Sequence, residues 1–178
     1  EFYSDTYTFN LIQKPLIQSF SIEVFPPNYT SIPSFKLTNQ QFIQVPKGSK
    51  VVVDLNVSES NFLEINSKIY NLSSSIFSYS FDVLKDKLLT FKTSQDALYF
   101  SEDLNLNFIS IPDNSPEIVV KEFRDSTYLN QIYFTVLTKD DYGLSKTEIL
   151  VESKDSIYKS VLKLPKNELS QQFNYALD

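Results

Sequence analysis

Apolar and polar side chains alternate in several separate segments of the chain. From Phe20 to Val24, apolar residues alternate with a serine and an acid, and two prolines follow shortly afterwards. A period of two puts one row of side chains on a buried face and the other in water, as in an antiparallel sheet covered on one side. Strands of this kind are predicted over residues 20–24, 51–57, 77–83 and 104–108.

Turn sequences separate these strands. Lys47–Gly48 predicts a turn after Pro46, and residues 85–87 predict a tight hairpin that joins segment 77–83 to a strand near Leu89. Segment 61–72 is less regular. It fits either two strands around Asn66–Ser67 or one short helical turn, and we favour the strands.

A domain boundary is predicted at residues 112–116, where two prolines flank Asp, Asn and Ser, because such a segment cannot continue a central strand. Five further strands are predicted at 118–123, 132–136, 144–151, 158–164 and 173–177. A seven-stranded immunoglobulin-like sandwich needs about 100 residues, so we expect the second domain to be truncated. The expected organisation is a strand or linker from a preceding module (1–13), a sandwich (14–112), a linker (113–116) and a second sandwich (117–178).

Composition supports an all-β fold. The chain has only two alanines, against 15 Phe and 11 Tyr, and Leu, Ile, Val and Phe make up about a third of its 178 residues. This is enough apolar material to build a core. The predicted fold class is therefore all-β, with tandem immunoglobulin-like β-sandwich domains.

Charge and missing residue types exclude several function classes. The chain contains no Cys and no His, which removes thiol and imidazole catalysis, disulfides and most zinc or copper sites. A net charge of −6 argues against nucleic-acid binding. No apolar run approaches the roughly 20 residues that cross a bilayer, and no signal peptide is recognisable.

Four motifs occur in order along the chain, at residues 14–30 (KP followed by FSIEVFPPNYT), 43–49 (IQVPKGS), 111–118 (IPDNSPEI) and 140–144 (DDYGL). This set resembles the large bacterial envelope proteins of domain-of-unknown-function family 4175. The resemblance implies extracytoplasmic β-sandwich modules, periplasmic or on the cell surface, tethered by a membrane anchor outside residues 1–178. It implies no reaction. A composition rich in Asn, Lys, Ser and Ile would suit a source of the Bacteroidota type.

The most function-like cluster is acidic. Asp113 and Asn114 lie in the predicted linker, and Asp140–Asp141 lie at a turn; together with Glu122 or Asp125 they could form an all-oxygen calcium site. The simpler interpretation, which we favour, is that these residues cap turns, with Gly143 supplying a positive φ. No other cofactor is expected.

The aromatic and acidic residues suggest two further function classes, carbohydrate binding and glycoside hydrolysis. Tyr3, Tyr29, Tyr142 and Tyr175 lie near turns or chain ends and could stack on a sugar ring, although most aromatic rings in such a fold fill the core. Glu64 and Glu102 adjoin apolar residues, but nothing pairs them as a glycosidase would require. We therefore expect a non-catalytic module that acts as a structural spacer or binds a protein partner. A carbohydrate-binding module and a calcium-rigidified adhesin are the alternatives.

Overall fold

The computed structural model describes residues 6–8, 13–95, 101–124, 126–127, 131–153, 156–162 and 168–177. Within these ranges the chain forms fourteen strands and one short 3-10 helix, and no α-helix, which confirms the all-β prediction. The chain divides into two compact units. Unit 1 comprises Glu1–Phe25 and Pro33–Ile111, and unit 2 comprises Pro26–Ile32 and Pro112–Asp178.

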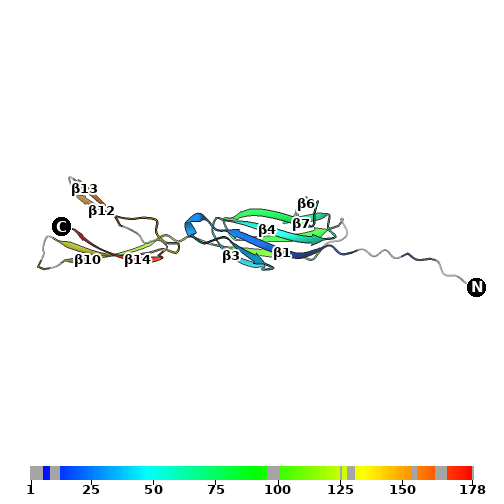
Figure 1. The fold of residues 1–178 in the computed structure, drawn as a ribbon, viewed down its shortest axis with the longest axis horizontal. Helices are drawn as coiled ribbons and strands as arrows, with labels where there is room; N and C mark the ends of the chain where they lie inside the picture. Colours follow the sequence, from blue (N-terminus) through cyan, green and yellow to red (C-terminus); the bar gives the residue numbers. More distant parts are fainter. Residues whose placement is uncertain are drawn as a thin grey trace, which may run out of the picture. The chain divides into compact units, whose positions relative to one another are not determined.

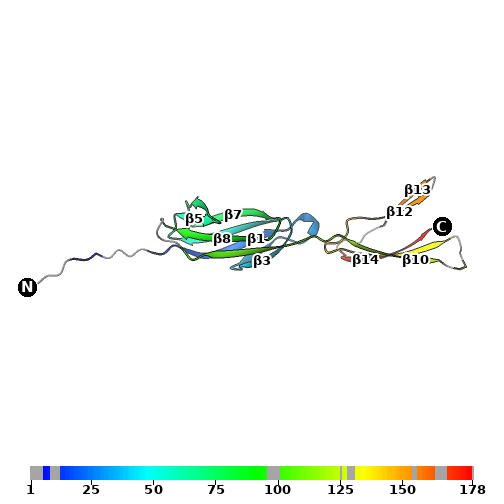
Figure 2. The same ribbon diagram turned by 180° about the vertical axis from the view of Figure 1, so that it is seen from behind.

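Unit 1 contains two sheets, which Figures 1 and 2 show as two layers. The four-stranded sheet has the order β2-β1-β4-β7 and is antiparallel throughout. Its strands are β1 (Leu16–Phe25), β2 (Phe35–Thr38), β4 (Ser49–Ser58) and β7 (Ile76–Val83). The five-stranded sheet has the order β3-β9-β8-β5-β6, in which β3 and β9 are parallel. Its strands are β3 (Phe42–Pro46), β5 (Phe62–Ile65), β6 (Lys68–Asn71), β8 (Lys87–Ser94) and β9 (Leu104–Ile111).

The core of unit 1 lies between these sheets. Alternate residues of β1 and β4 are buried from one side, and alternate residues of β8 and β9 are buried from the other. Ring contacts cross the interface: Phe81 on β7 lies 5.0 Å from Phe108 on β9, and Tyr79 lies 6.4 Å from Phe91 on β8. Burying each large apolar side chain contributes roughly 1.5–3 kcal/mol. Unit 1 is thus a β-sandwich, and its immunoglobulin-like character stays a prediction.

Of two turns predicted from the sequence, one is confirmed and the other is wrong. Asn66 and Ser67 have positive φ angles of 44° and 70° and join β5 to β6 as a hairpin, as expected for a turn of type I′. The hairpin predicted at residues 85–87 is wrong. β7 and β8 belong to different sheets, so this segment crosses from one layer to the other. Both strands bury one face, and an alternating pattern alone does not tell which layer each strand joins.

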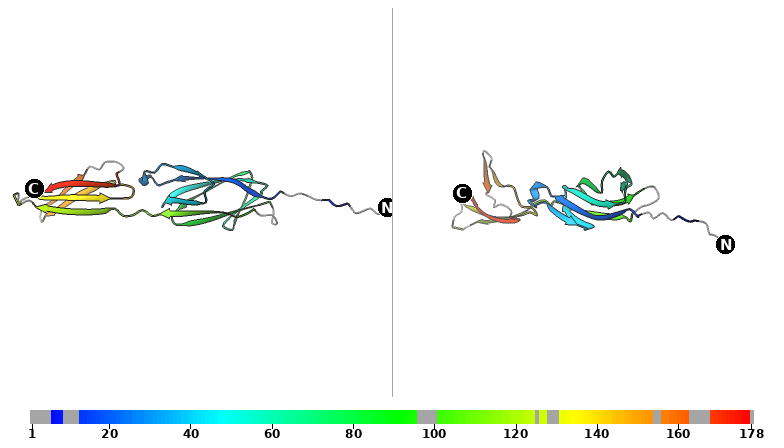
Figure 3. Two further views of the ribbon diagram at one scale, coloured as in Figure 1. Left: turned by 90° about the horizontal axis from the view of Figure 1, so that it is seen from below. Right: turned by 45° about the vertical axis from the view of Figure 1, so that its right-hand side comes forward.

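Unit 2 contains a three-stranded antiparallel sheet of order β10-β11-β14 and a separate hairpin, β12–β13. The elements are η1 (Asn28–Thr30), β10 (Glu117–Arg124), β11 (Ile132–Lys139), β12 (Thr147–Ser153), β13 (Ser156–Leu162) and β14 (Ser170–Leu177). Figure 3 (left) shows β11 between β10 and β14. Among the described residues of unit 2, Val136 is the one buried hydrophobic side chain. The described part of unit 2 therefore buries fewer apolar side chains than the described part of unit 1.

Segment Pro26–Ile32 belongs to unit 2, although it lies within the predicted domain 14–112. Most of the predicted segment 1–13 lies outside the described residues. In the part of the chain that is described, no helix has the length and apolar character needed to cross a membrane.

Candidate functional site

The acidic residues singled out in the sequence meet in unit 2. The carboxylate of Asp141 accepts hydrogen bonds from the backbone N–H of Asn114 at 3.2 Å and from its side-chain amide at 3.1 Å. Asp113 shares a side-chain hydrogen bond with Asp141. Asp140 instead accepts from the backbone N–H of Tyr142 at 3.2 Å, as in an Asx turn. Three of the four predicted residues are therefore brought together, and the fourth caps its own turn.

This arrangement shifts the two carboxyl groups in opposite directions. Partial desolvation, followed by the charges of Asp141 and Asp140, raises the pKa of Asp113. The hydrogen bond from the Asn114 backbone is the main cause that lowers the pKa of Asp141. Desolvation and the charge of Asp141 therefore favour the neutral form of Asp113, whereas the donors of Asn114 favour the charged form of Asp141.

The turn that follows is fixed by backbone geometry. Gly143 has a φ of +84°, and a Cβ added there would lie 3.3 Å from the carbonyl oxygen of Glu168. The backbone N–H of Asp140 donates to the carbonyl of Leu169 at 2.9 Å. The acidic turn therefore closes against the segment that leads into β14, and Gly143 provides both the left-handed conformation and the space.

These contacts agree with a turn-capping role. In the described residues no group of three or more acidic side chains is placed to hold a metal ion. Glu122, considered as a further ligand, accepts a 2.6 Å hydrogen bond from Arg124. Asp125 lies outside the described residues. Calcium binding stays a prediction.

Tyr29 connects segment 26–32 to this turn. Its ring meets Tyr142 edge to face, with centroids 5.7 Å apart and planes at 82°. Desolvation, followed by the charges of nearby aspartates, raises the pKa of both phenols. The two rings are perpendicular, so this pair does not form the coplanar platform that would stack on a sugar. Tyr175 lies on β14, and Tyr3 lies outside the described residues.

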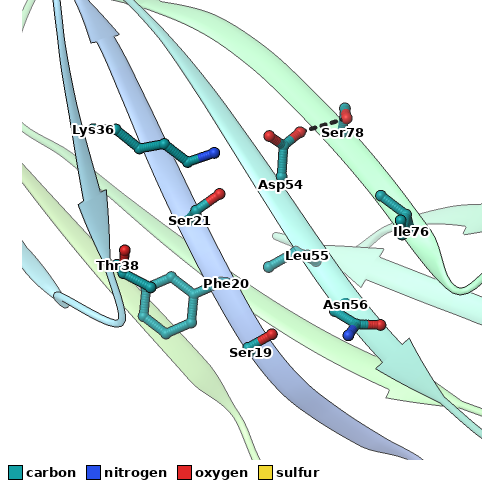
Figure 4. A pocket seen from close by; sticks show the side chains of 10 residues that line it. All are labelled: Ser19, Phe20, Ser21, Lys36, Thr38, Asp54, Leu55, Asn56, Ile76 and Ser78. Carbon is teal, nitrogen blue, oxygen red and sulfur yellow. Dashed lines mark hydrogen bonds between the residues drawn. The ribbon is translucent and has the colours of Figure 1, made fainter.

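A second feature is an open depression of about 510 Å³ on the outer face of the four-stranded sheet of unit 1 (Figure 4). Its polar lining includes Lys36, Ser21 and Asp54, and Ser78 donates a 2.5 Å hydrogen bond to Asp54. The one aromatic residue in this lining, Phe20, is buried. The depression offers hydroxyl, amide and charged groups on a shallow surface, without an exposed ring.

The two glutamates considered for catalysis lie in unit 1. Glu64 is half-buried on β5, and Glu102 follows a segment outside the described residues. The side chain of Glu102 is 93% exposed and pairs with Lys14 at 3.5 Å. It therefore lacks the burial expected of a catalytic acid.

A third feature, which the search for polar motifs missed, is the edge strand β10. All eight of its residues are exposed. Ile118, Val119, Val120 and Phe123 expose 60%, 50%, 56% and 56% of their surface. The run of three β-branched residues was visible in the sequence. Its exposure was not, because an apolar run of this length usually marks a buried strand.

Comparison with known proteins adds one assignment. The model of a family described as a domain of unknown function, DUF4175, matches residues 12–171. A search of curated proteins finds no match. The matched region spans both units and most of the chain, and the chain therefore belongs to the DUF4175 family.

Proposed function

We propose that this chain is a non-catalytic, extracytoplasmic module of a membrane-anchored bacterial envelope protein, and that it binds a protein partner through an exposed strand edge. Unit 1, with its well-packed core, serves as the structural spacer. Unit 2 provides the binding surface. The envelope setting is what the resemblance of the four sequence motifs to this family implies.

The observation that carries the proposal is the exposure of β10. A long edge strand with apolar side chains is a template for pairing with another chain, and natural proteins usually shorten, charge or cover such edges. β10 runs for eight residues and exposes four large apolar side chains. Addition of a partner strand would use its free backbone groups for affinity and its side chains for specificity.

Neither alternative gains a specific observation. A carbohydrate-binding module would be expected to present coplanar rings, whereas Tyr29 and Tyr142 are perpendicular. A calcium-rigidified adhesin would need ligand oxygens directed at a common point. Instead, Asp140 and Asp141 accept hydrogen bonds from their own loop and from Asn114.

Site-specific photo-crosslinking tests the proposal. A benzophenone amino acid replaces Val119 on β10 in the full-length protein, in cells that express it. The control replaces Asn56, an exposed residue on β4, which is central in its sheet and lines the polar depression. We expect a discrete protein adduct from position 119 and none from position 56. Adducts from position 56 alone, or from neither position, would contradict binding at the strand edge.

A further inference from the structure

The free side of β10 is the starting point. β10 pairs with β11 along its whole length, from Glu117 opposite Lys139 to Arg124 opposite Ile132. Among the described residues no strand pairs with its other side. The outer edge of the sheet in unit 2 therefore presents unpaired backbone donors and acceptors over eight residues.

The sequence of this edge is complementary to itself. The segment Glu117–Lys121 reads Glu-Ile-Val-Val-Lys and has Val119 at its centre. If two copies pair antiparallel about Val119, Glu117 of each lies opposite Lys121 of the other. Ile118 then lies opposite Val120, and Val119 lies opposite itself. Opposite charges and β-branched pairs at facing positions are the combinations that stabilise adjacent strands.

Neighbouring registers lose this match. Moving the centre to Val120 places Glu117 opposite Phe123 and Val119 opposite Lys121, so charges face apolar groups. Moving it to Lys121 places two lysines directly opposite each other, which is destabilising. Charge and side-chain type thus select one register out of the three.

The same register also matches the two faces of the sheet. Ile118 and Val120 lie opposite Thr138 and Val136 on β11, which are both buried, so they share the apolar face. Directly opposed residues of an antiparallel pair point to the same face. Pairing about Val119 therefore continues the apolar face of one copy into the apolar face of the other.

The opposite edge of the sheet is less suited to pairing. β14 has Gln171 buried and Phe173 and Tyr175 half-buried, whereas every residue of β10 is exposed. The more accessible apolar edge is β10. A two-fold symmetric contact of this kind uses the same patch on both molecules and closes on itself.

We propose that the partner of β10 is β10 of a second copy of this chain, paired antiparallel about Val119 to give a continuous six-stranded sheet. The inference rests on the proposed function, because it identifies the protein that the exposed edge binds.

Sedimentation analysis of the 178-residue chain over a wide concentration range tests the pairing. The chain is expected to dimerise. The dimer contains two facing pairs, because residue 117 of each copy lies opposite residue 121 of the other. Lys121→Glu makes both residues of each pair acidic. Glu117→Lys makes both residues of each pair basic. Each variant alone is expected to dimerise at least about tenfold more weakly, because two favourable pairs become repulsive. Lys85→Glu, which makes the same charge change at an exposed position in unit 1, is the control and should dimerise as the parent does.

Mixing the two variants is the decisive step. In the mixed dimer one facing pair keeps the native Glu117 and Lys121, and the other pair has both of its charges reversed. Every acid then faces a base, so association should return to about the parental strength. Far-UV circular dichroism of each variant checks that it folds.

A chain that stays monomeric, or a mixture that associates no more strongly than either variant alone, would overturn self-pairing. If position 119 then crosslinks to a different protein, the proposed function survives and this inference fails.

Discussion

Asp113 and Asp141 belong to one hydrogen-bonded turn and respond to it in opposite ways. Asp141 is stabilised as an anion by Asn114, while Asp113 is stabilised in its neutral form beside that anion. A shift in pKa between the folded and unfolded states makes stability depend on pH. The turn should therefore show two pH dependences of opposite sign.

We predict that Asp113→Asn stabilises the protein at neutral pH and that Asp141→Asn destabilises it. The folded pKa of Asp113 is raised, so its ionisation costs stability as pH rises through that value, and an amide, which can still donate to Asp141, avoids this cost. The pKa of Asp141 is lower in the folded state than in the unfolded state. The stability that ionised Asp141 contributes is therefore present at pH values above its unfolded pKa, and it is lost as the pH falls through its folded pKa. Thermal unfolding between acid and neutral pH measures both.

Both differences from the parent chain should shrink towards acid pH, where the two carboxyl groups are protonated in the folded and unfolded states alike. Ser145→Ala, at an exposed position in the same loop, is the control and should change little at any pH. Two variants that shift stability in the same direction at neutral pH would contradict the hydrogen-bond assignment.

The role of a single residue could be predicted from the sequence when its contacts are with neighbours along the chain. The turn at Asp140–Gly143 was predictable because Asx and glycine turns involve neighbours in sequence. The meeting of Asp141 with Asn114 joins residues far apart along the chain, so the sequence could only suggest it. The contact of Tyr29 with Tyr142 was not predictable, because Tyr29 lies in a segment assigned to the first domain.

At the scale of strands, the alternation of apolar and polar residues predicted where strands lie, but it did not predict which strands share a sheet. β1, β4, β7 and β9 each include a segment where apolar and polar residues alternate, because one face of each strand contacts the core. β7 and β8 belong to different sheets because of how the two layers pack. An alternating pattern within one strand carries no information about this packing. The β5–β6 hairpin was predictable since Asn66 tolerates a positive φ.

The sandwich core supports a direct prediction at this scale. Ile22 on β1 is fully buried, while Ile69 on β6 is 66% exposed. Ile22→Ala should lower the free energy of unfolding by about 2–5 kcal/mol, since it removes buried apolar surface and leaves a cavity. Ile69→Ala makes the same chemical change and should cost less than about 0.5 kcal/mol, as surface substitutions usually do. Urea unfolding followed by far-UV circular dichroism compares the two, and equal losses would show that Ile22 does not lie in the core.

At the scale of the whole molecule, the two units differ in how their apolar residues are used. Where unit 1 is described, it places sixteen buried hydrophobic side chains between two sheets. Among the described residues of unit 2, Val136 is the one buried hydrophobic side chain, and apolar residues of β10 and of the β12–β13 hairpin are exposed. This exposed apolar surface is the basis for the binding surface that we propose on β10. DUF4175 membership was anticipated from four short motifs, whereas the exposure of β10 required the fold.

Residue-resolved amide hydrogen exchange of the dilute chain tests most directly whether β10 presents an open edge. β4 has a strand on each side, β1 and β7, so its amides should exchange slowly. On β10, every second amide faces away from β11, and we predict that these amides exchange at close to the unprotected rate while their neighbours are protected. Uniform protection along β10, comparable with that of β4, would show that the edge is already covered and would contradict its role as the binding surface.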